Sequence, residues 1–385
     1  MRCLQPRRSA GPVCQPPGLL TVVLCLWAGL ASGSETGTRP TQLERVKVSA
    51  DGRGFVLVPS GRSFVPWGFN YDHDAKGQLL EDYWHTDWDR VVGDFREIKA
   101  LGANVVRIHL QVARFLEAPD RPNKENIERL KRLFQLAEEL GLYLDVTGLG
   151  CYHRQDIPAW YDALDEEARW AVQAFFWETI AQAGAGHPAV FCYDLMNEPV
   201  VPVDKRKAGD WLVDAALGGK YFVQRITLDP RGRARKDIAR AWVDRLATAI
   251  RKHDTDALIT VGLLPGTKER ADAWSGFVPS ELIPPLDFIA THIYPESEKL
   301  DVSLQILSHF SVGRPVVVEE VFPLRCNTQE LKGFLRASRQ YASGWIGFYC
   351  GVPPDELRQS KELAAQITAA WLELFQELAP EFRQP

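Results

Sequence analysis

Two glutamates follow apolar runs of the chain and could form a pair of catalytic acids. Asn197 and Glu198 come directly after the run 187–196, which is rich in β-branched and aromatic residues. The next residue, Pro199, cannot donate to a sheet ladder, so we expect a buried strand to stop there. A second run, Pro315–Glu320, also ends in a carboxylate. Two carboxyl groups that face one sugar suit glycoside hydrolysis, because one can protonate the leaving oxygen while the other attacks the anomeric carbon or activates a water.

Further polar side chains stand at the ends of other apolar runs. An arginine, two amides, a histidine and a phenol can orient carboxylates and bind sugar hydroxyls. Each of them taken alone is more often a structural partner, so the prediction depends on the whole set. The residues that we expect to contact the substrate are Asn70, Arg107, Asn197, His292 and Tyr294. We expect His109 to lie behind them and to support them rather than to contact the sugar.

The elements that would position these groups alternate along the chain. Eight short apolar runs are each followed by an amphipathic or connecting segment, which predicts a parallel β/α architecture. The count of eight, without a glycine-rich phosphate loop after the first strand, favours a closed (β/α)8 TIM barrel, with a small hairpin before it at 46–58. The predicted core strands are 64–70, 105–109, 143–148, 187–198, 258–263, 288–293, 315–320 and 344–350.

Length and composition restrict the possible functions. The chain has 385 residues, of which 45% are hydrophobic and 25% charged, and a net charge of −5, so nothing points to a nucleic-acid partner. Residues 1–33 resemble a signal peptide, with arginines before a short apolar stretch and small residues after it. We expect a polar tether at 34–45 and one catalytic domain at 46–385. The protein would be secreted or periplasmic, monomeric and without stable membrane insertion; a retained anchor is the alternative.

The cysteines give no sign of a metal site or a disulfide scaffold. Cys151, Cys192, Cys326 and Cys350 lie beyond the leader, and none forms a CxxC pair. We expect no metal and no cofactor. Cys326 and Cys350 fall just after the last two predicted strands and could form a disulfide.

The chain resembles the clan A glycoside hydrolases, most closely family 5 with its cellulases and mannanases. The resemblance runs from about residue 46 to the C-terminus. Five motifs carry it in order along the chain: Trp67-Gly-Phe-Asn70, Asn104-Val-Val-Arg107, Tyr193-Asp-Leu-Met-Asn-Glu-Pro199, His292-Ile-Tyr294 and Pro315-Val-Val-Val-Glu-Glu320.

The resemblance assigns roles within the acid pair. It implies that Glu198 is the acid/base and that Glu320 is the nucleophile of a retaining mechanism. Strand periodicity cannot choose between Glu319 and Glu320, because both faces of a barrel strand are buried. Arg107 near Glu320 would favour its ionised form, and that negative charge would keep Glu198 protonated.

Aromatic side chains near the strand ends are candidate platforms for sugar rings. We expect Trp84 and Trp160 to serve in this way. The sequence departs from family 5 at two places. Gly148-Leu149-Gly150 replaces the histidine at the end of the third strand, with His153 only later, and the eighth strand lacks a tryptophan, for which Tyr349 would substitute.

We therefore expect a secreted retaining β-glycosidase of polysaccharide catabolism, acting on a β-linked mannan or glucan. One alternative is an exo-acting β-glycosidase or transglycosylase, favoured if the long loop 200–235 closes one end of the cleft. The other is a catalytically silent carbohydrate-binding barrel.

Overall fold

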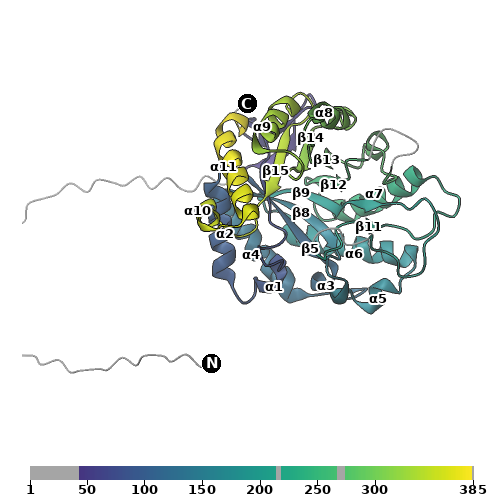
Figure 1. Ribbon diagram of the computed structural model, residues 1–385. Coiled ribbons are helices and arrows are strands. Elements are labelled where there is room, and N and C mark those ends of the chain that lie inside the picture. Colours follow the sequence, from purple (N-terminus) through teal and green to yellow (C-terminus); the bar gives the residue numbers. More distant parts are fainter. Residues whose placement is uncertain (1–42, 214–217, 267–273, 384–385) are drawn as a thin grey trace, which may run out of the picture. The chain divides into compact units, whose positions relative to one another are not determined.

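Eight parallel strands form a closed barrel in the computed structural model, which describes residues 43–213, 218–266 and 274–383 (Figure 1). Each strand pairs with the next along the chain, and β15 pairs with β4 to complete the ring. The predicted TIM barrel is thereby confirmed. The barrel strands are β4 (Trp67–Asn70), β5 (Val105–Gln111), β8 (Tyr143–Gly150), β9 (Val190–Asn197), β12 (Leu258–Leu263), β13 (Ile289–His292), β14 (Val316–Glu320) and β15 (Gly344–Phe348).

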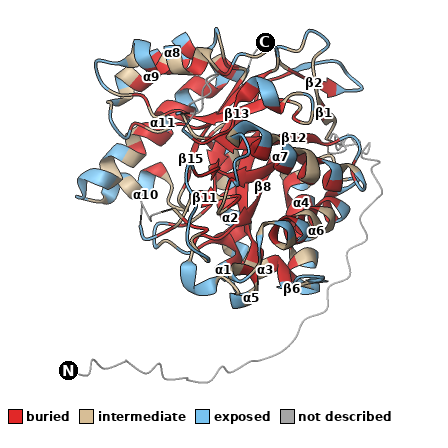
Figure 2. Ribbon diagram, turned by 90° about the vertical axis from the view of Figure 1, so that its right-hand side faces the viewer, coloured by how far each residue is buried: buried red, intermediate tan, exposed pale blue. Residues whose placement is uncertain are grey.

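Long helices surround the strands, with their buried faces toward the barrel (Figure 2). Local signals set their ends. Asn123 accepts a hydrogen bond from the backbone of Asn126 at the start of α4, and Gly141 ends that helix with a φ of 66°. Asp165 caps α6 in the same way. The long helices are α2 (Trp88–Ala100), α4 (Lys124–Leu140), α6 (Glu166–Gly184), α7 (Arg235–Arg251), α8 (Leu300–Ser308), α9 (Thr328–Ser338) and α11 (Leu363–Arg383).

Short elements fill the connections. Only the 3₁₀ turn η2 (Pro279–Leu282) lies between β12 and β13 in the described residues, as the proline-rich sequence there suggests. The long connection after β9 contains one small parallel pair, β10 (Pro199–Val200) with β11 (Gln224–Arg225). The remaining short elements are α1 (Leu80–Tyr83), α3 (Val112–Phe115), β6 (Leu116–Ala118), β7 (Arg121–Pro122), η1 (Arg154–Asp156), α5 (Ala159–Asp162) and α10 (Pro354–Gln359).

A small antiparallel sheet precedes the barrel. The predicted hairpin is present as β1 (Arg45–Val48) and β2 (Phe55–Val58), and β3 (Ser63–Phe64) adds a third strand. Phe55 packs edge-on against Phe191 and Phe288, with ring centroids 5.3 Å apart in both cases. Both partners lie at the starts of barrel strands, so this sheet covers the N-terminal end of the barrel and leaves the C-terminal end for the site.

The predicted leader, 1–33, and most of the tether lie outside the described residues. The tether ends earlier than expected, because the carbonyl of Glu44 already accepts a hydrogen bond from Tyr143 and β1 begins at Arg45. None of the helices within the described ranges combines the length and the apolar character that crossing a bilayer requires.

The predicted disulfide between Cys326 and Cys350 is absent, and both thiols are free. Their surroundings differ, which explains the error. Cys326 lies near Glu330 at the start of α9, whereas Cys350 lies near Asp72 and Asp74 beyond β4. Proximity to the ends of neighbouring strands did not bring the two sulfurs together.

Candidate active site

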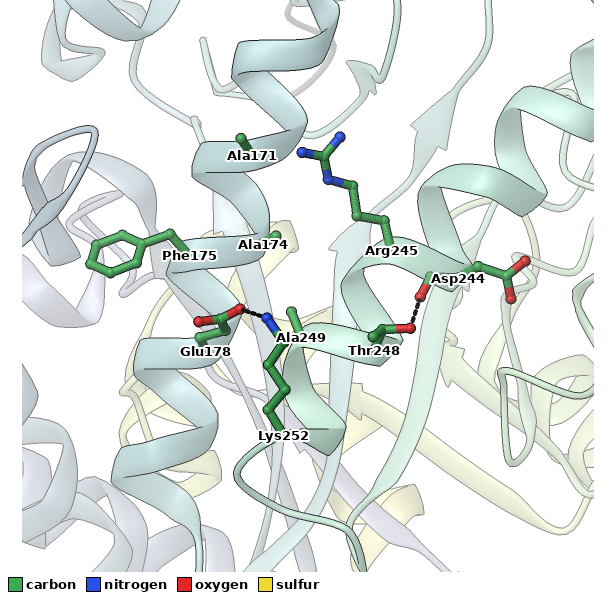
Figure 3. A pocket seen from close by; sticks show the side chains of 9 residues that line it. All are labelled: Ala171, Ala174, Phe175, Glu178, Asp244, Arg245, Thr248, Ala249 and Lys252. Atoms are coloured by element: carbon green, nitrogen blue, oxygen red, sulfur yellow. Dashed lines mark hydrogen bonds and ion pairs between the residues drawn. The ribbon is translucent and has the colours of Figure 1, made fainter.

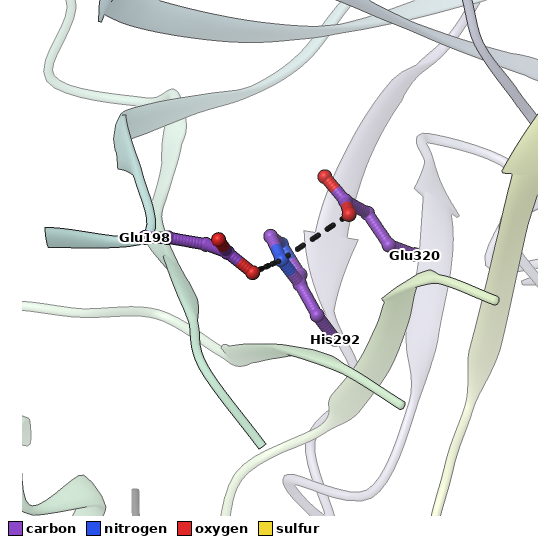
Figure 4. A group of neighbouring side chains, drawn as sticks. All are labelled: Glu198, His292 and Glu320. Atoms are coloured by element: carbon purple, nitrogen blue, oxygen red, sulfur yellow. Dashed lines mark hydrogen bonds and ion pairs between the residues drawn. The ribbon is translucent and has the colours of Figure 1, made fainter. Parts of the chain in front are cut away.

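The acid pair lies at the C-terminal ends of two barrel strands. Glu198 directly follows β9, and Glu320 is the last residue of β14. Each offers a carboxylate oxygen to a group, completed by His292, in which the atoms lie within 4.8 Å of one another (Figure 4). Glu198 has a φ of 49°, a left-handed conformation that costs a residue other than glycine about 1 kcal/mol and that aims its side chain across the barrel mouth. The two predicted acids therefore meet.

His292 lies between the two acids. Its Nδ1 atom is 2.8 Å from Glu198 Oε1 and 3.4 Å from Glu320 Oε2 (Figure 4). Burial by itself lowers the pKa of His292, but the carboxylates of Glu320, Glu198 and Glu319 outweigh burial and raise that pKa to about 10. His292 is thus an imidazolium at neutral pH and gives both acids a positive neighbour.

Arg107 is the centre of a buried hydrogen-bond network below the acids. Its guanidinium has no exposed surface, so its charge must be met by partners inside the barrel. Nη1 donates to Glu320 Oε1 at 2.8 Å, and Nη2 donates to Asp194 Oδ2 at 2.7 Å. The arginine also donates to the side-chain oxygens of Asn70 and Asn197, at 3.0 and 2.9 Å. Arg107 therefore holds Glu320 in place and connects β5 with β4, β9 and β14.

Glu320 and Glu319 face different surroundings, although they are neighbours in sequence. The Glu319 side chain is fully enclosed, 3.3 Å from Arg107 and 3.5 Å from His292. The Glu320 side chain keeps 10% exposure at the mouth and accepts a short hydrogen bond from Tyr294. Glu320 is therefore the one that a ligand in the mouth can reach.

The electrostatics of Glu320 differ in part from what Arg107 alone predicts. Burial raises the pKa of Glu320, and this effect exceeds the lowering by His292, Arg107 and the Tyr294 hydrogen bond. Arg107 does favour the ionised form of Glu320, as expected. All contributions together nonetheless raise the pKa, so Glu320 holds its proton to a higher pH than an ordinary glutamate.

A layer of buried acids below the site was missed by the sequence analysis. Asp145 on β8 and Asp194 on β9 lie beside Glu319, with carboxylate oxygens within 4.8 Å of one another. Burial and the charge of Glu319 raise the pKa of Asp145 well above its usual value. The sequence did contain a signal for this layer, because an aspartate stands inside each of two otherwise apolar strands.

Among the described residues, two groups have atoms close enough together to hold a metal ion: Glu198, His292 and Glu320 in the mouth, and Asp145, Asp194 and Glu319 below it. Each group already has a cationic partner, His292 in the first and Arg107 beside the second. The charge of the carboxylates is thus met by protein groups.

The predicted amide ligands are held mainly by other protein atoms. Asn70 donates to two backbone carbonyls and accepts from Arg107, so it positions the arginine. The carbonyl oxygen of Asn197 accepts from Arg107, and its amide donates to the Phe222 carbonyl at 3.1 Å. This leaves one amide hydrogen of Asn197 for a ligand.

Two of the predicted aromatic platforms lie in the protein core. Trp84 has no exposed surface, and its indole donates to Asn126 on α4 at 3.1 Å. Tyr349 packs against Phe69 and Tyr71 and is also buried. Neither ring has a free face for a sugar, so both predictions are wrong. For Tyr349 the reason is that neighbouring residues of a strand alternate between the two faces of the barrel wall.

Phe348, one residue before Tyr349, has the orientation that was expected of Tyr349. It pairs in register with Asn70, whose side chain points into the barrel, so both residues face the same side. Phe348 is only partly buried. The sequence signal was present, because the strand offers two consecutive aromatic residues and only one can face inward.

The other two predicted contacts, Trp160 and His153, lie in the connection after β8. Trp160 on α5 is partly buried and packs edge-on against Tyr161, with ring centroids 5.7 Å apart. His153 lines a cavity of about 10 Å³ together with Gln111 and Arg114, room for about one water. No contact joins either residue to the acid pair within the described parts of the chain.

A pocket of about 560 Å³ lies away from the acids, on the outer surface between α6 and α7 (Figure 3). Its walls are Ala174, Phe175 and neighbouring residues, and an ion pair between Lys252 and Glu178 crosses it at 2.5 Å. The pocket presents no facing pair of acids, and we assign the chemistry to the strand ends.

Comparison with known proteins places the chain in a family. The family model for cellulase (glycosyl hydrolase family 5) matches residues 71–304, more than half of the chain, whereas no curated protein matches it. An exo-β-1,4-mannosidase from Opitutaceae bacterium strain TAV5 has a similar structure, with a TM-score of 0.63 and 19% identity over 88% of this chain. This chain spans 62% of that enzyme's length.

Two mannanases share the fold as well. The β-1,4-mannanase of the sea hare Aplysia kurodai has a TM-score of 0.56 and 17% identity, over 86% of this chain and 96% of its own. The endo-1,4-β-mannanase of Rhizomucor miehei has a TM-score of 0.59 and 15% identity, over 88% and 99%. At such identities the likeness shows the fold, and the family match goes further: the chain belongs to glycoside hydrolase family 5 and is a glycoside hydrolase.

Proposed function

We propose that the protein is a retaining β-glycosidase in which Glu198 is the acid/base and Glu320 the nucleophile. The proposal rests on the group formed by these two carboxylates and His292. A carboxylate oxygen of each glutamate and a ring nitrogen of the histidine all lie within 4.8 Å of one another. Retaining enzymes need carboxyl groups about 5–5.5 Å apart, whereas inverting enzymes need about 6.5–9.5 Å to admit a water. The short separation favours direct attack on the sugar.

The contacts of each acid suit the two steps of a double displacement. Arg107 and Tyr294 each bind one oxygen of Glu320, which fixes the carboxylate for attack on the anomeric carbon. His292 holds Glu198 through the 2.8 Å contact between Nδ1 and Oε1, which positions this carboxyl group to give its proton to the leaving oxygen. Once the glycosyl ester has formed, the same side chain, now a carboxylate, accepts a proton from the water that attacks the ester.

The substrate we propose is a β-linked mannan or a related oligosaccharide. The support is the kind of enzyme that shares the fold, two mannanases and an exo-mannosidase. A β-glucan is the alternative, which parallel assays on β-1,4-mannan and β-1,4-glucan will distinguish. An inactive binding barrel is disfavoured, because both acids and the groups that hold them are in place.

Azide rescue tests both roles at once. With a dinitrophenyl β-mannoside or β-glucoside as substrate, Glu320→Gly should lose activity by on the order of 1,000-fold or more, and azide should restore turnover with an α-glycosyl azide as product. Glu198→Ala should instead give a β-glycosyl azide, because azide then attacks the covalent intermediate. Rescue of Glu319→Gly but not Glu320→Gly would reassign the nucleophile, and undiminished activity of both acid variants would refute the proposal.

We further propose export through the leader 1–33, followed by a monomeric mature enzyme. The basic start, the short apolar stretch and the small residues after it support export. Expression with the leader should release into the periplasm or medium a protein that lacks it, and intact-mass measurement with light scattering will check both the cleavage and the monomer.

A further inference from the structure

One stretch of the long connection after β9 extends over the barrel mouth. We call residues Lys220–Gln224 the covering segment. The Tyr221 amide donates to the Tyr152 carbonyl at 3.0 Å, and the Phe222 ring packs edge-on against Tyr152, with centroids 4.8 Å apart. The Gln224 side chain donates to the Leu149 carbonyl at 2.9 Å. These contacts attach the segment to the residues at and just beyond the end of β8.

The other end of the covering segment reaches the loop that follows β4. Lys220 is only 4% exposed, and a Cβ atom on Gly77 would lie 3.1 Å from its ammonium nitrogen. Lys220 also interacts electrostatically with His73 in the same loop. The segment therefore crosses the mouth from β8 to β4 and covers the end of β5 between them, where His109 and Tyr152 are already buried.

A buried carboxylate near this crossing has hydrogen-bonding capacity left over. Among the described residues no partner is found for Asp72 Oδ1, although Asp72 Oδ2 contacts His73 at 2.7 Å. The ammonium group of Lys220 lies beside Gly77 in the same loop. Asp72 interacts electrostatically with the buried side chains of His109 and Tyr152, and Tyr152 in turn contacts Tyr221 and Phe222 of the covering segment. Buried polar atoms without partners are rare, and a ligand hydroxyl is one way to satisfy them.

The covering segment lies on one side of the acid pair. Its Phe222 carbonyl accepts from Asn197, whereas the next residue, Glu198, turns toward His292 on β13. In the proposed mechanism Glu198 faces the leaving oxygen, so the leaving part of the substrate occupies the β13 side. The sugar that is attacked then lies toward Asn197, and anything beyond its non-reducing end meets the covering segment.

From this arrangement we infer that the enzyme is exo-acting: it removes single sugars from the non-reducing ends of β-linked chains, and Lys220 and Asp72 bind hydroxyls of the terminal sugar. The inference depends on the proposed glycosidase function and deepens it. If an internal sugar of a chain were bound for attack, the sugar attached to its non-reducing side would overlap the space occupied by Lys220, Phe222 and the loop after β4.

End-blocked substrates test the inference on the unmodified enzyme. β-1,4-Mannohexaose and cellohexaose, each labelled at the reducing end, are compared with versions that carry a 4,6-O-acetal on the non-reducing terminal sugar. We expect the free chains to shorten one sugar at a time, the labelled pentaose appearing first, and the blocked chains to remain intact. Cleavage of a blocked chain, or early labelled di- and trisaccharides from a free one, would overturn exo action while leaving the glycosidase function in place.

A pair of lysine variants tests the binding role. Lys220→Met should lower kcat/KM on the free hexaose by about 10- to 100-fold, as expected for the loss of a charged hydrogen bond to the sugar. Lys207→Met, an exposed lysine of the same connection, is the matched control and should change nothing. Equal kcat/KM values for Lys220→Met and the unmodified enzyme would refute the role of Lys220.

Failure of the parent proposal would look different. If the unmodified enzyme hydrolyses neither hexaose nor the dinitrophenyl glycosides, the glycosidase function and the exo inference fail together. If it hydrolyses the dinitrophenyl glycosides and cuts hexaose internally, only the exo inference fails.

Discussion

The protonation of Glu320 is balanced by the groups that touch it. Burial raises its pKa, while His292, Arg107 and the hydroxyl of Tyr294 lower it. The nucleophile must be ionised, so activity is lost as pH falls through the pKa of Glu320. Because that pKa is raised, the acid limb of the pH profile should lie above the range of an ordinary glutamate.

Tyr294→Phe removes one hydroxyl group from the set of contacts that fix the pKa of Glu320. Without its hydrogen bond, the ionised form of Glu320 loses a stabilising partner and the pKa rises further. The acid limb of kcat/KM should move to higher pH by about 0.5–1 unit, the equivalent of one hydrogen bond. The measurement is the pH dependence of kcat/KM, with Tyr341→Phe, a tyrosine beyond α9, as control. An acid limb at the same pH in both variants would contradict this account.

At the scale of elements, the close packing of strands in the barrel makes the charged network possible. Gly262 on β12 faces the network, and a Cβ atom there would lie 2.9 Å from Glu319 Oε2 and 3.0 Å from both Arg107 Nη2 and His292 Nε2. All three neighbours are buried ends of held side chains. The missing side chain on β12 thus leaves the space in which charges from β5, β13 and β14 meet.

Gly262→Ala should therefore disturb both stability and catalysis. We expect a loss of about 1–3 kcal/mol from overpacking, together with at least about a 10-fold fall in kcat, because Arg107 and His292 must shift away from the acids. Gly93→Ala is the control, since Gly93 is exposed on α2 and a Cβ there meets no atom within 4 Å. Denaturant unfolding and initial rates will compare the two, and equal behaviour would show that the space beside Gly262 is not needed.

At the scale of the whole molecule, stability and chemistry are placed at opposite ends of the barrel. The β1–β3 sheet covers the N-terminal end through Phe55 and Phe64, which contact Phe191, Phe288 and Tyr143 at the strand starts. The acids and the covering segment lie at the C-terminal end. This division is the one that the TIM barrel commonly shows.

Phe55→Ala should lower stability without changing catalysis. Phe55 is only 2% exposed, so truncation should lower the free energy of unfolding by about 3–5 kcal/mol, while kcat measured well below the melting temperature stays unchanged. The same substitution at partly buried Phe175 on α6 should cost less. A large fall in kcat for the folded Phe55 variant would show that the two ends are coupled.

Local patterns were sufficient to predict the barrel and the acids. Apolar runs bounded by proline and glycine gave the eight strands. Because the C-terminal ends of parallel strands converge, the sequence alone predicts that Glu198 and Glu320 meet. These features depend on neighbours in sequence and on one rule of topology.

The tertiary structure decided what depends on direction and on distant partners. Both faces of a barrel strand are buried, so hydrophobicity cannot tell whether Glu319 or Glu320 reaches the mouth, or that Phe348 faces inward and Tyr349 outward. Nor can it show that Lys220 crosses to the loop after β4, because that contact joins residues far apart in the chain. The sequence by itself determined which groups stand at the strand ends; packing across the barrel determined which of them a sugar can touch.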